Sequence, residues 1–238
     1  MSRPGPVAKR QRSAVRAPLS RERVLAAALE LADREGIEAV SMRAVADPRG
    51  VKAMALYKHV EGKEAILDGL TDLVFAEMRP PPRDVGWREG LVTRALGMRK
   101  TLLTHRWAAG LVEARTSPSP GRLRYHDASL GLLLDSGFSL ELAYAAILTQ
   151  DSYVYGFVAQ EVTWPFSPDE RTELIEELAP AIDPSQYPNV VRMMGFVLGR
   201  GAKARRGSSS QAGYDADFAF GVELMLDGLE RARRRKLR

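Results

Sequence analysis

Between residues 41 and 63 the chain carries basic, aromatic and hydroxyl side chains at short intervals. An arginine such as Arg43 can make two parallel hydrogen bonds to the edge of a guanine, and small apolar side chains can touch thymine methyl groups. Lysine, tyrosine and histidine are better suited to phosphate oxygens. We therefore interpret this segment as a candidate DNA-contacting surface; the alternatives are a solvated arginine at Arg43 and core packing at Tyr57. The candidate residues are Ser41, Arg43, Lys52, Ala53, Met54, Ala55, Tyr57, Lys58, His59 and Lys63.

The elements that would position these side chains are two short helices joined by a tight turn. One helix is predicted to begin behind Ser41, a typical N-cap residue, and the other to span residues 52–59. Gly50 lies between them and allows a positive φ, while Leu56 is expected to pack beneath the crossing. A longer helix is predicted over residues 20–35. Together these helices match the helix-turn-helix unit, whose second helix enters the major groove of DNA.

Catalytic and metal-binding chemistry find little support in the sequence. The chain has three histidines and no cysteine, and the histidines are not spaced as metal ligands. It contains no phosphate-binding glycine loop, no dinucleotide fingerprint and no nucleophile–base signature. We therefore predict that the protein is not an enzyme and uses no metal and no cofactor.

Basic residues gather at both ends of the chain. Residues 1–18 hold five basic residues and no acidic one, and residues 231–238 hold six basic residues, whereas the whole chain carries a net charge of +5. We expect residues 1–18 to be a disordered basic arm, because such ends either contact polyanions or remain solvated. No apolar run of about 18 residues and no signal peptide is visible. The expected location is therefore the cytoplasm, without contact to a membrane.

The rest of the sequence has helical periodicity and no alternating strand pattern, which predicts an all-α fold. We place a helix-turn-helix domain at residues 19–64 and a larger helical domain at residues 65–235. Residues 200–213, rich in glycine and serine, are expected to form a mobile loop. Further helices are predicted over residues 63–78, 87–104, 106–114, 123–136, 140–161, 168–178, 189–197 and 215–233.

Five stretches resemble the tetracycline-repressor (TetR) family of bacterial regulators. The first two are GIEAVSMRAVA at residues 36–46 and GVKAMALYKHVEGKEAILDGL at residues 50–70. The other three are similar to the ligand-binding and dimerisation region of the tetracycline repressor's own subgroup: LLTHRWAAGLVEARTSPSP at residues 102–120, LLLDSGFSLELAYAAILTQDSYVYGFVAQE at residues 132–161 and FAFGVELMLDGLER at residues 218–231.

The resemblance implies a homodimer in which a three-helix head binds a double-stranded DNA operator. A fourth helix would link the head to a helical bundle that houses a ligand cavity. Dimerisation would pair residues 215–233 with residues 123–136 or 140–161. A small hydrophobic effector would release the repressor by favouring the form of the dimer that does not bind DNA.

Aromatic, methionine and polar side chains of the second region are the candidates for lining that cavity. A large apolar pocket with few polar groups suits a hydrophobic effector, although each residue taken alone could belong to the ordinary core. The candidates are Met98, Leu102, His105, Trp107, Tyr125, Gln150, Tyr153, Phe157 and Trp164.

The chain departs from the family pattern in two places. Asp47-Pro48-Arg49 stands where the second helix would end, and proline disfavours helix at the residue before it. We predict a shortened or kinked second helix with Arg49 turned to solvent or phosphate. Val112 or Glu113 replaces the family's metal–tetracycline histidine, so neither magnesium nor tetracycline is expected. The first departure supports a second hypothesis, a helical ligand-binding or interaction protein with weakened or lost DNA binding.

Overall fold

The computed structural model describes residues 18–47, 50–82, 84–115, 118–163, 168–204 and 210–236. Throughout these residues the chain forms helices and no strand, which confirms the predicted all-α class. None of these helices is long and apolar enough to span a membrane. The elements are α1 (Arg21–Glu35), η1 (Ile37–Ala39), α2 (Met42–Ala46), α3 (Ala53–Leu56), α4 (Lys63–Glu77), α5 (Trp87–Thr104), α6 (Ala108–Ala114), α7 (Pro120–Asp135), α8 (Leu140–Thr163), α9 (Pro168–Leu178), η3 (Ala179–Ala181), α10 (Pro188–Ala204) and α11 (Ser210–Lys236).

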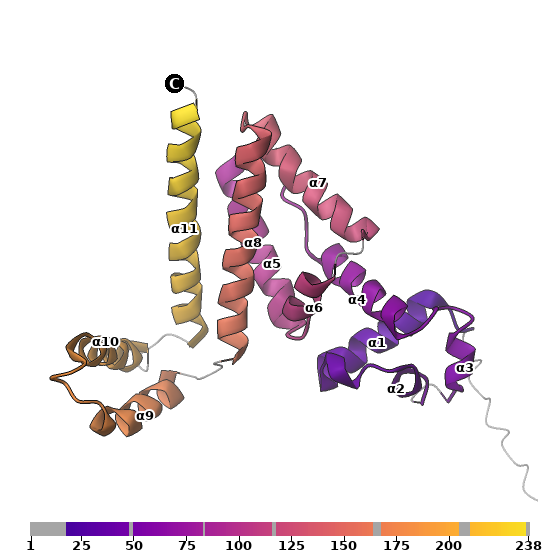
Figure 1. The fold of residues 1–238 in the computed structure, drawn as a ribbon, viewed down its shortest axis with the longest axis horizontal. Coiled ribbons are helices and arrows are strands. Elements are labelled where there is room, and N and C mark those ends of the chain that lie inside the picture. Colours follow the sequence, from indigo (N-terminus) through magenta and orange to yellow (C-terminus); the bar gives the residue numbers. More distant parts are fainter. Residues whose placement is uncertain are drawn as a thin grey trace, which may run out of the picture.

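The helices form a small head and a larger body (Figure 1). α1, α2 and α3 make up the head, and α4 leads from it into the body. In the body, α8 packs against α5, α7 and α11. α9 and α10 pack mainly against each other and lie beside the first turns of α11.

Several helix ends form where local sequence signals predict them. The Ser41 hydroxyl accepts a hydrogen bond from the backbone N–H of Ala44 at 3.2 Å and so caps α2. Gly50 and Gly137 adopt φ values of 62° and 82°, the left-handed conformation that tight turns between helices require. α9 begins at Pro168, as predicted, because the first turn of a helix has no partner for the N–H that proline lacks.

Three elements differ in length from the prediction. α3 has only four residues, because the backbone passes into a turn after Leu56. α10 is longer than predicted, with 17 residues that continue to Ala204, and α11 begins earlier, at Ser210. Helix therefore occupies both ends of the segment 200–213 that was expected to be a loop, and its centre lies outside the described residues. The expected arm at residues 1–18 also lies outside them, apart from Pro18.

Two apolar cores share a single helix, α4. The first half of α4 contributes Ile66, Leu67 and Leu70 to the core of the head. Its second half contributes Val74 and Phe75 to the core of the body. Head and body are therefore joined by packed side chains as well as by the chain itself.

A buried arginine of α5 ties the long helices of the body together. The guanidinium of Arg99 donates to both carboxylate oxygens of Glu161 on α8, at 2.8 and 2.9 Å. It also donates to Asp215 on α11 at 2.6 Å. The Arg99–Glu161 pair fixes α5 relative to α8, because both side chains are buried and removing one would leave the other charge unpaired away from water. Asp215, which is 55% exposed, adds a link to α11 at the surface.

Candidate DNA-binding surface and ligand cavity

The helix-turn-helix unit of the head is built from α2, the turn at Gly50 and α3. The Gly50 N–H donates to the carbonyl of Asp47 at 3.0 Å, which closes the turn. Leu56 is fully buried beneath the two helices, as predicted for its packing role. α2 ends at Ala46, in agreement with the predicted shortening of this helix. Pro48 and Arg49 lie outside the described residues, so the orientation of Arg49 stays a prediction.

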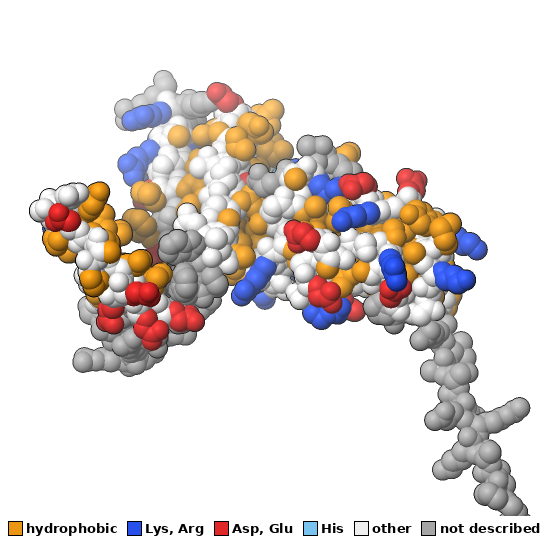
Figure 2. Space-filling view, turned by 60° about the horizontal axis from the view of Figure 1, so that its bottom comes forward, with side chains coloured by type: hydrophobic (Ala, Val, Ile, Leu, Met, Phe, Trp, Pro, Cys, Tyr) orange, Lys and Arg blue, Asp and Glu red, His pale blue; other side chains and the backbone are white. Residues whose placement is uncertain are grey.

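The predicted DNA-contacting side chains lie on the outer side of this unit. Met54 is 73% exposed and Tyr57 50% exposed, so core packing does not account for Tyr57. The Arg43 side chain is 87% exposed. Figure 2 shows several Lys and Arg side chains spread over the surface of the head. The other candidates are exposed at Lys52, Lys58 and Lys63 and half-buried at Ser41, Ala53, Ala55 and His59.

The exposed side chain of Arg43 makes a weak ion pair at the end of α2. Its Nε lies 3.5 Å from Oδ2 of Asp47, one helical turn further on. Exposed pairs at this spacing contribute about 0.3–0.5 kcal/mol, so the guanidinium can leave Asp47 at little cost. Arg43 is therefore free to reorient towards an acceptor on a neighbouring molecule.

A buried histidine connects the head to the body. His105, at the end of α5, lies with Nδ1 2.7 Å from Asp33 of α1 and Nε2 2.9 Å from Glu77 of α4. Trp107 Nε1 donates to the same oxygen of Asp33 at 2.7 Å. Burial lowers the pKa of His105, but the hydrogen bonds to the two carboxylates outweigh it, so the pKa is raised above its usual value.

A hollow of about 450 Å³ opens between α4, α6, α7 and α8. The rings of Phe75, His126, Tyr144 and Tyr155 line it, with Val112, Leu130, Ile147 and Leu148. Its polar lining consists of Arg122, Asp151, Ser152 and the His126 ring. An apolar, ring-lined hollow with a few polar groups suits a flat hydrophobic molecule.

Eight of the nine predicted ligand-binding residues lie in the described part of the chain, and none of these eight is among the side chains that line this hollow. His105 and Trp107 form the junction between head and body instead. Tyr153 and Phe157 pack against Phe218 of α11, with ring centroids 5.5 and 5.1 Å from it. Trp164 lies outside the described residues, and the others are buried in the body: Met98, Leu102, Tyr125 and Gln150. Contact of these nine residues with an effector therefore stays a prediction.

Arg94 was missed from the sequence, as were the residues that line the hollow. It is fully buried in α5 and donates to Gln150 Oε1 at 2.7 Å. A signal was available, because Arg94 lies at helical spacing from Leu91 and Met98 on the apolar side of the predicted helix. An arginine within such a stripe must be paired internally.

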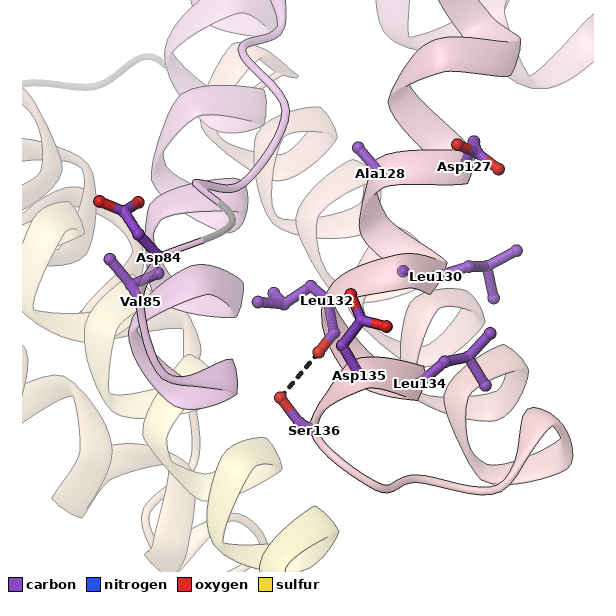
Figure 3. Close-up of a pocket in the computed structure, with 10 residues that line it drawn as sticks. Asp84, Val85, Asp127, Ala128, Leu130, Leu132, Leu134, Asp135 and Ser136 are labelled. Carbon is purple, nitrogen blue, oxygen red and sulfur yellow. Dashed lines mark hydrogen bonds between the residues drawn. The ribbon is translucent and has the colours of Figure 1, made fainter.

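A second hollow, of about 540 Å³, lies between Asp84 and the last turns of α7. In Figure 3 the carboxylates of Asp84, Asp127 and Asp135 point in different directions, and Ser136 donates to the carbonyl of Leu132 at 2.7 Å. Carboxylates that do not converge cannot share one cation. The part of the chain that the structure describes holds no group of three side chains that could bind a metal ion.

Both parts of the chain match protein families of the tetracycline-repressor type. Residues 24–70 match the family described as "Bacterial regulatory proteins, tetR family". Residues 79–233 match the family "Tetracyclin repressor-like, C-terminal domain". The class A tetracycline repressor of transposon 1721 from Escherichia coli is 30% identical over 215 residues, which cover 88% of this chain and 90% of that protein.

Solved structures are similar over almost the whole length. ActR from Streptomyces coelicolor in complex with actinorhodin has a TM-score of 0.75 at 23% identity and covers 91% of this chain and 98% of its own. A variant of TetR from Acinetobacter baumannii in complex with minocycline has a TM-score of 0.64 at 26% identity, covering 91% and 99%. At 23% identity, the similarity to ActR shows a shared fold and nothing further.

Proposed function

The chain belongs to the TetR family of bacterial regulatory proteins, and from this premise we propose that it is a homodimeric transcriptional repressor released from its operator by a small hydrophobic effector. The observation that carries the proposal is the exposed outer side of the helix-turn-helix unit, with Arg43, Met54 and Tyr57 turned to solvent. A regulator of this kind acts on the bacterial chromosome, so we also propose a cytoplasmic location.

We assign the head, residues 19–64, to operator binding. Arg43 would read a base edge, while Ala53, Met54 and Ala55 would offer apolar contact to thymine methyl groups. Tyr57, the lysines at 52, 58 and 63, and His59 would hold phosphates. The Ser41 hydroxyl accepts the capping hydrogen bond of α2, which leaves its O–H able to donate to a phosphate oxygen.

The body, residues 65–235, would carry the dimer interface and the effector site. Leu140, Tyr144 and Leu148 are exposed at intervals of four residues on α8, and Phe220 and Leu224 at the same interval on α11. α8 and α11 lie side by side (Figure 1). Two apolar stripes on adjacent helices suit a four-helix interface with a second copy, which favours α8 over α7 as the partner of α11.

A Leu224→Glu variant is expected to weaken the dimer by at least about a hundredfold, because each of the two copies loses a buried leucine worth about 1.5–3 kcal/mol and gains a charge. Light scattering over a dilution series measures the dissociation constant of the dimer. Leu123→Glu on α7, also an exposed leucine, is the matched control. Equal dissociation constants for both variants would contradict the assignment of the interface.

Support for a small-molecule effector comes from the hollow between α4 and α8 and from the TetR relative whose structure contains minocycline. Val112 lines this hollow. Because Val112 or Glu113 takes the place of the family's metal-binding histidine, we do not propose a magnesium–tetracycline complex as the effector. The alternative, a ligand-binding protein with weakened DNA binding, is favoured by the shortness of α2 and α3.

A gel-shift experiment with the DNA upstream of the protein's own gene separates the two functions. The repressor is expected to give a saturable complex that weakens steeply as salt rises, because each phosphate contact releases bound counterions. A protein that binds this DNA no more tightly than an unrelated fragment of the same length would support the alternative.

A further inference from the structure

The buried guanidinium of Arg94 is surrounded by groups from two other helices. Its Nε donates to Ser129 Oγ at 2.9 Å and its Nη1 donates to Gln150 Oε1 at 2.7 Å. Nη2 lies 2.8 Å from Oδ1 of Asp151. The guanidinium carbon lies 4.9 Å from the centre of the Tyr125 ring. Arg94 thus links α5 to α7 and α8 through one charged group.

Three polar atoms of this cluster have no hydrogen-bond partner among the described residues: Nη2 of Arg94, Oδ1 of Asp151 and the hydroxyl of Tyr125. Nη2 and Oδ1 attract each other as ions, but their geometry does not make a hydrogen bond. Buried polar atoms without a hydrogen bond are rare in native proteins. Of these three residues, Asp151 is the one that a molecule in the hollow can reach, because its side chain is 17% exposed there.

The cluster lies directly at the hollow between α4 and α8. Asp151 is one of the residues that line the hollow. The Tyr125 ring lies behind two further lining residues, with its centroid 5.8 Å from Phe75 and 6.0 Å from His126. A molecule in the hollow would therefore contact both apolar rings and the Asp151 carboxylate.

The charges around the hollow restrict what it can accept. Arg94 neutralises Asp151, and Arg122 adds a second positive charge to the lining. Burial lowers the pKa of His126 below its usual value, so this ring is neutral at pH 7. The surroundings are positive overall, and they disfavour an organic cation even though a carboxylate is present.

Building on the proposed function, we infer that Asp151 is the group that selects the effector, and that the effector is an aromatic molecule with a hydroxyl group, neutral or anionic rather than cationic. The hydroxyl would donate to the exposed part of the Asp151 carboxylate, whose side chain is 17% exposed and lines the hollow. The buried guanidinium of Arg94 would hold that carboxylate in place from behind. The rings of Phe75 and Tyr155 would hold the aromatic part of the molecule.

A matched pair of probes tests this inference: 2-hydroxyanthraquinone and anthraquinone, which differ by one hydroxyl. Binding is followed by quenching of tryptophan fluorescence. The wild-type protein is expected to bind the hydroxylated probe at least about tenfold more tightly, the usual effect of one hydrogen bond to a charged group. Equal affinity for the two probes, or binding of neither, would overturn the inference.

Variants then assign the preference to Asp151. The double variant Arg94→Met, Asp151→Leu removes both charges and retains apolar packing, so it is expected to fold and to bind both probes equally. Asp151→Asn serves as a second variant and is expected to retain part of the preference, because the amide oxygen still accepts. Asp135→Leu, which removes a carboxylate from the other hollow, should keep the full preference. A double variant that still prefers the hydroxylated probe would contradict the role of Asp151.

The gel shift without probe separates this inference from the proposed function. A specific operator complex together with no preference between the probes would end the inference and leave the repressor function intact. Probe preference without any operator complex would support the ligand site and count against the repressor.

Discussion

An Arg43→Ala variant is expected to bind the operator at least about thirtyfold more weakly than the wild type. A bidentate arginine–guanine contact contributes about 1–3 kcal/mol, and a homodimer makes it twice, so the smallest expected loss is about 2 kcal/mol. The folded head should not change, because the Arg43 side chain is 87% exposed and pairs only weakly with Asp47. Fluorescence anisotropy with labelled operator DNA measures the affinity.

Two matched variants show whether the loss reflects base recognition. Arg124→Ala removes the same charge from an exposed position on α7 and should leave the affinity within about twofold. Lys58→Ala is expected to weaken binding to all DNA sequences alike. It should also lower the number of counterions released on binding by about one per subunit, which is read from the slope of affinity against salt. Arg43→Ala should instead relax the preference at one base pair in each half-site. If Arg43→Ala behaves like Arg124→Ala, Arg43 does not contact the operator.

A His105→Gln variant is expected to lose about 2–3 kcal/mol of unfolding free energy near pH 6 and much less at alkaline pH. Both ring nitrogens of His105 lie within hydrogen-bond distance of a carboxylate, so the ring donates to both only when it is protonated. A hydrogen bond to a charged group contributes about 1.5–3 kcal/mol. Because Asp33 and Glu77 are partly exposed to water, we expect the two bonds of His105 together to contribute about as much as one fully buried bond.

The sign of this pH dependence follows from the raised pKa of His105. The protonated ring stabilises the folded protein fully below the unfolded pKa of about 6.5, and this contribution is lost as the pH rises through the higher folded pKa. Urea unfolding at several pH values measures the difference between wild type and variant. His126, whose pKa is lowered by burial, has the opposite pH dependence in both proteins and cancels in that difference.

Trp107→Phe is the matched control for the histidine. It removes the hydrogen bond from Trp107 Nε1 to Asp33 and introduces no titrating group. The expected loss is about 1 kcal/mol, because Asp33 is partly exposed, and it is the same from pH 6 to alkaline pH, where the carboxylate stays charged. A His105→Gln variant with an equally flat profile would show that the ring is neutral in the folded protein.

Elements fixed by local chemistry were predictable from the sequence. Ser41 caps α2, Gly50 turns the chain and Pro168 opens α9, because each depends on a few neighbouring residues and on one backbone preference. Leu56 was predictable as a buried residue from its place between the two short helices. For the head, the sequence therefore predicts both the helices and the residue types on its outer side.

Features that depend on packing between distant helices were not predictable. The spacing of Arg94 within an apolar stripe indicates that it is buried, but it does not indicate its partners on α7 and α8, which lie 35 and 56 residues further along the chain. The lining of the hollow likewise depends on how four helices meet. His105 was predicted to line the cavity, and its position between Asp33 and Glu77 follows only from the way the head docks on the body.

The sharing of α4 between two cores limits how this protein can be recombined with its relatives. A chimaera cut in front of Lys63 would separate Leu56 and Val24 from Ile66 and Leu70, the residues that cover them. A head that is transferred to another protein must therefore include the first half of α4. A workable seam lies between Leu70 and Val74, where one helix passes from one core to the other.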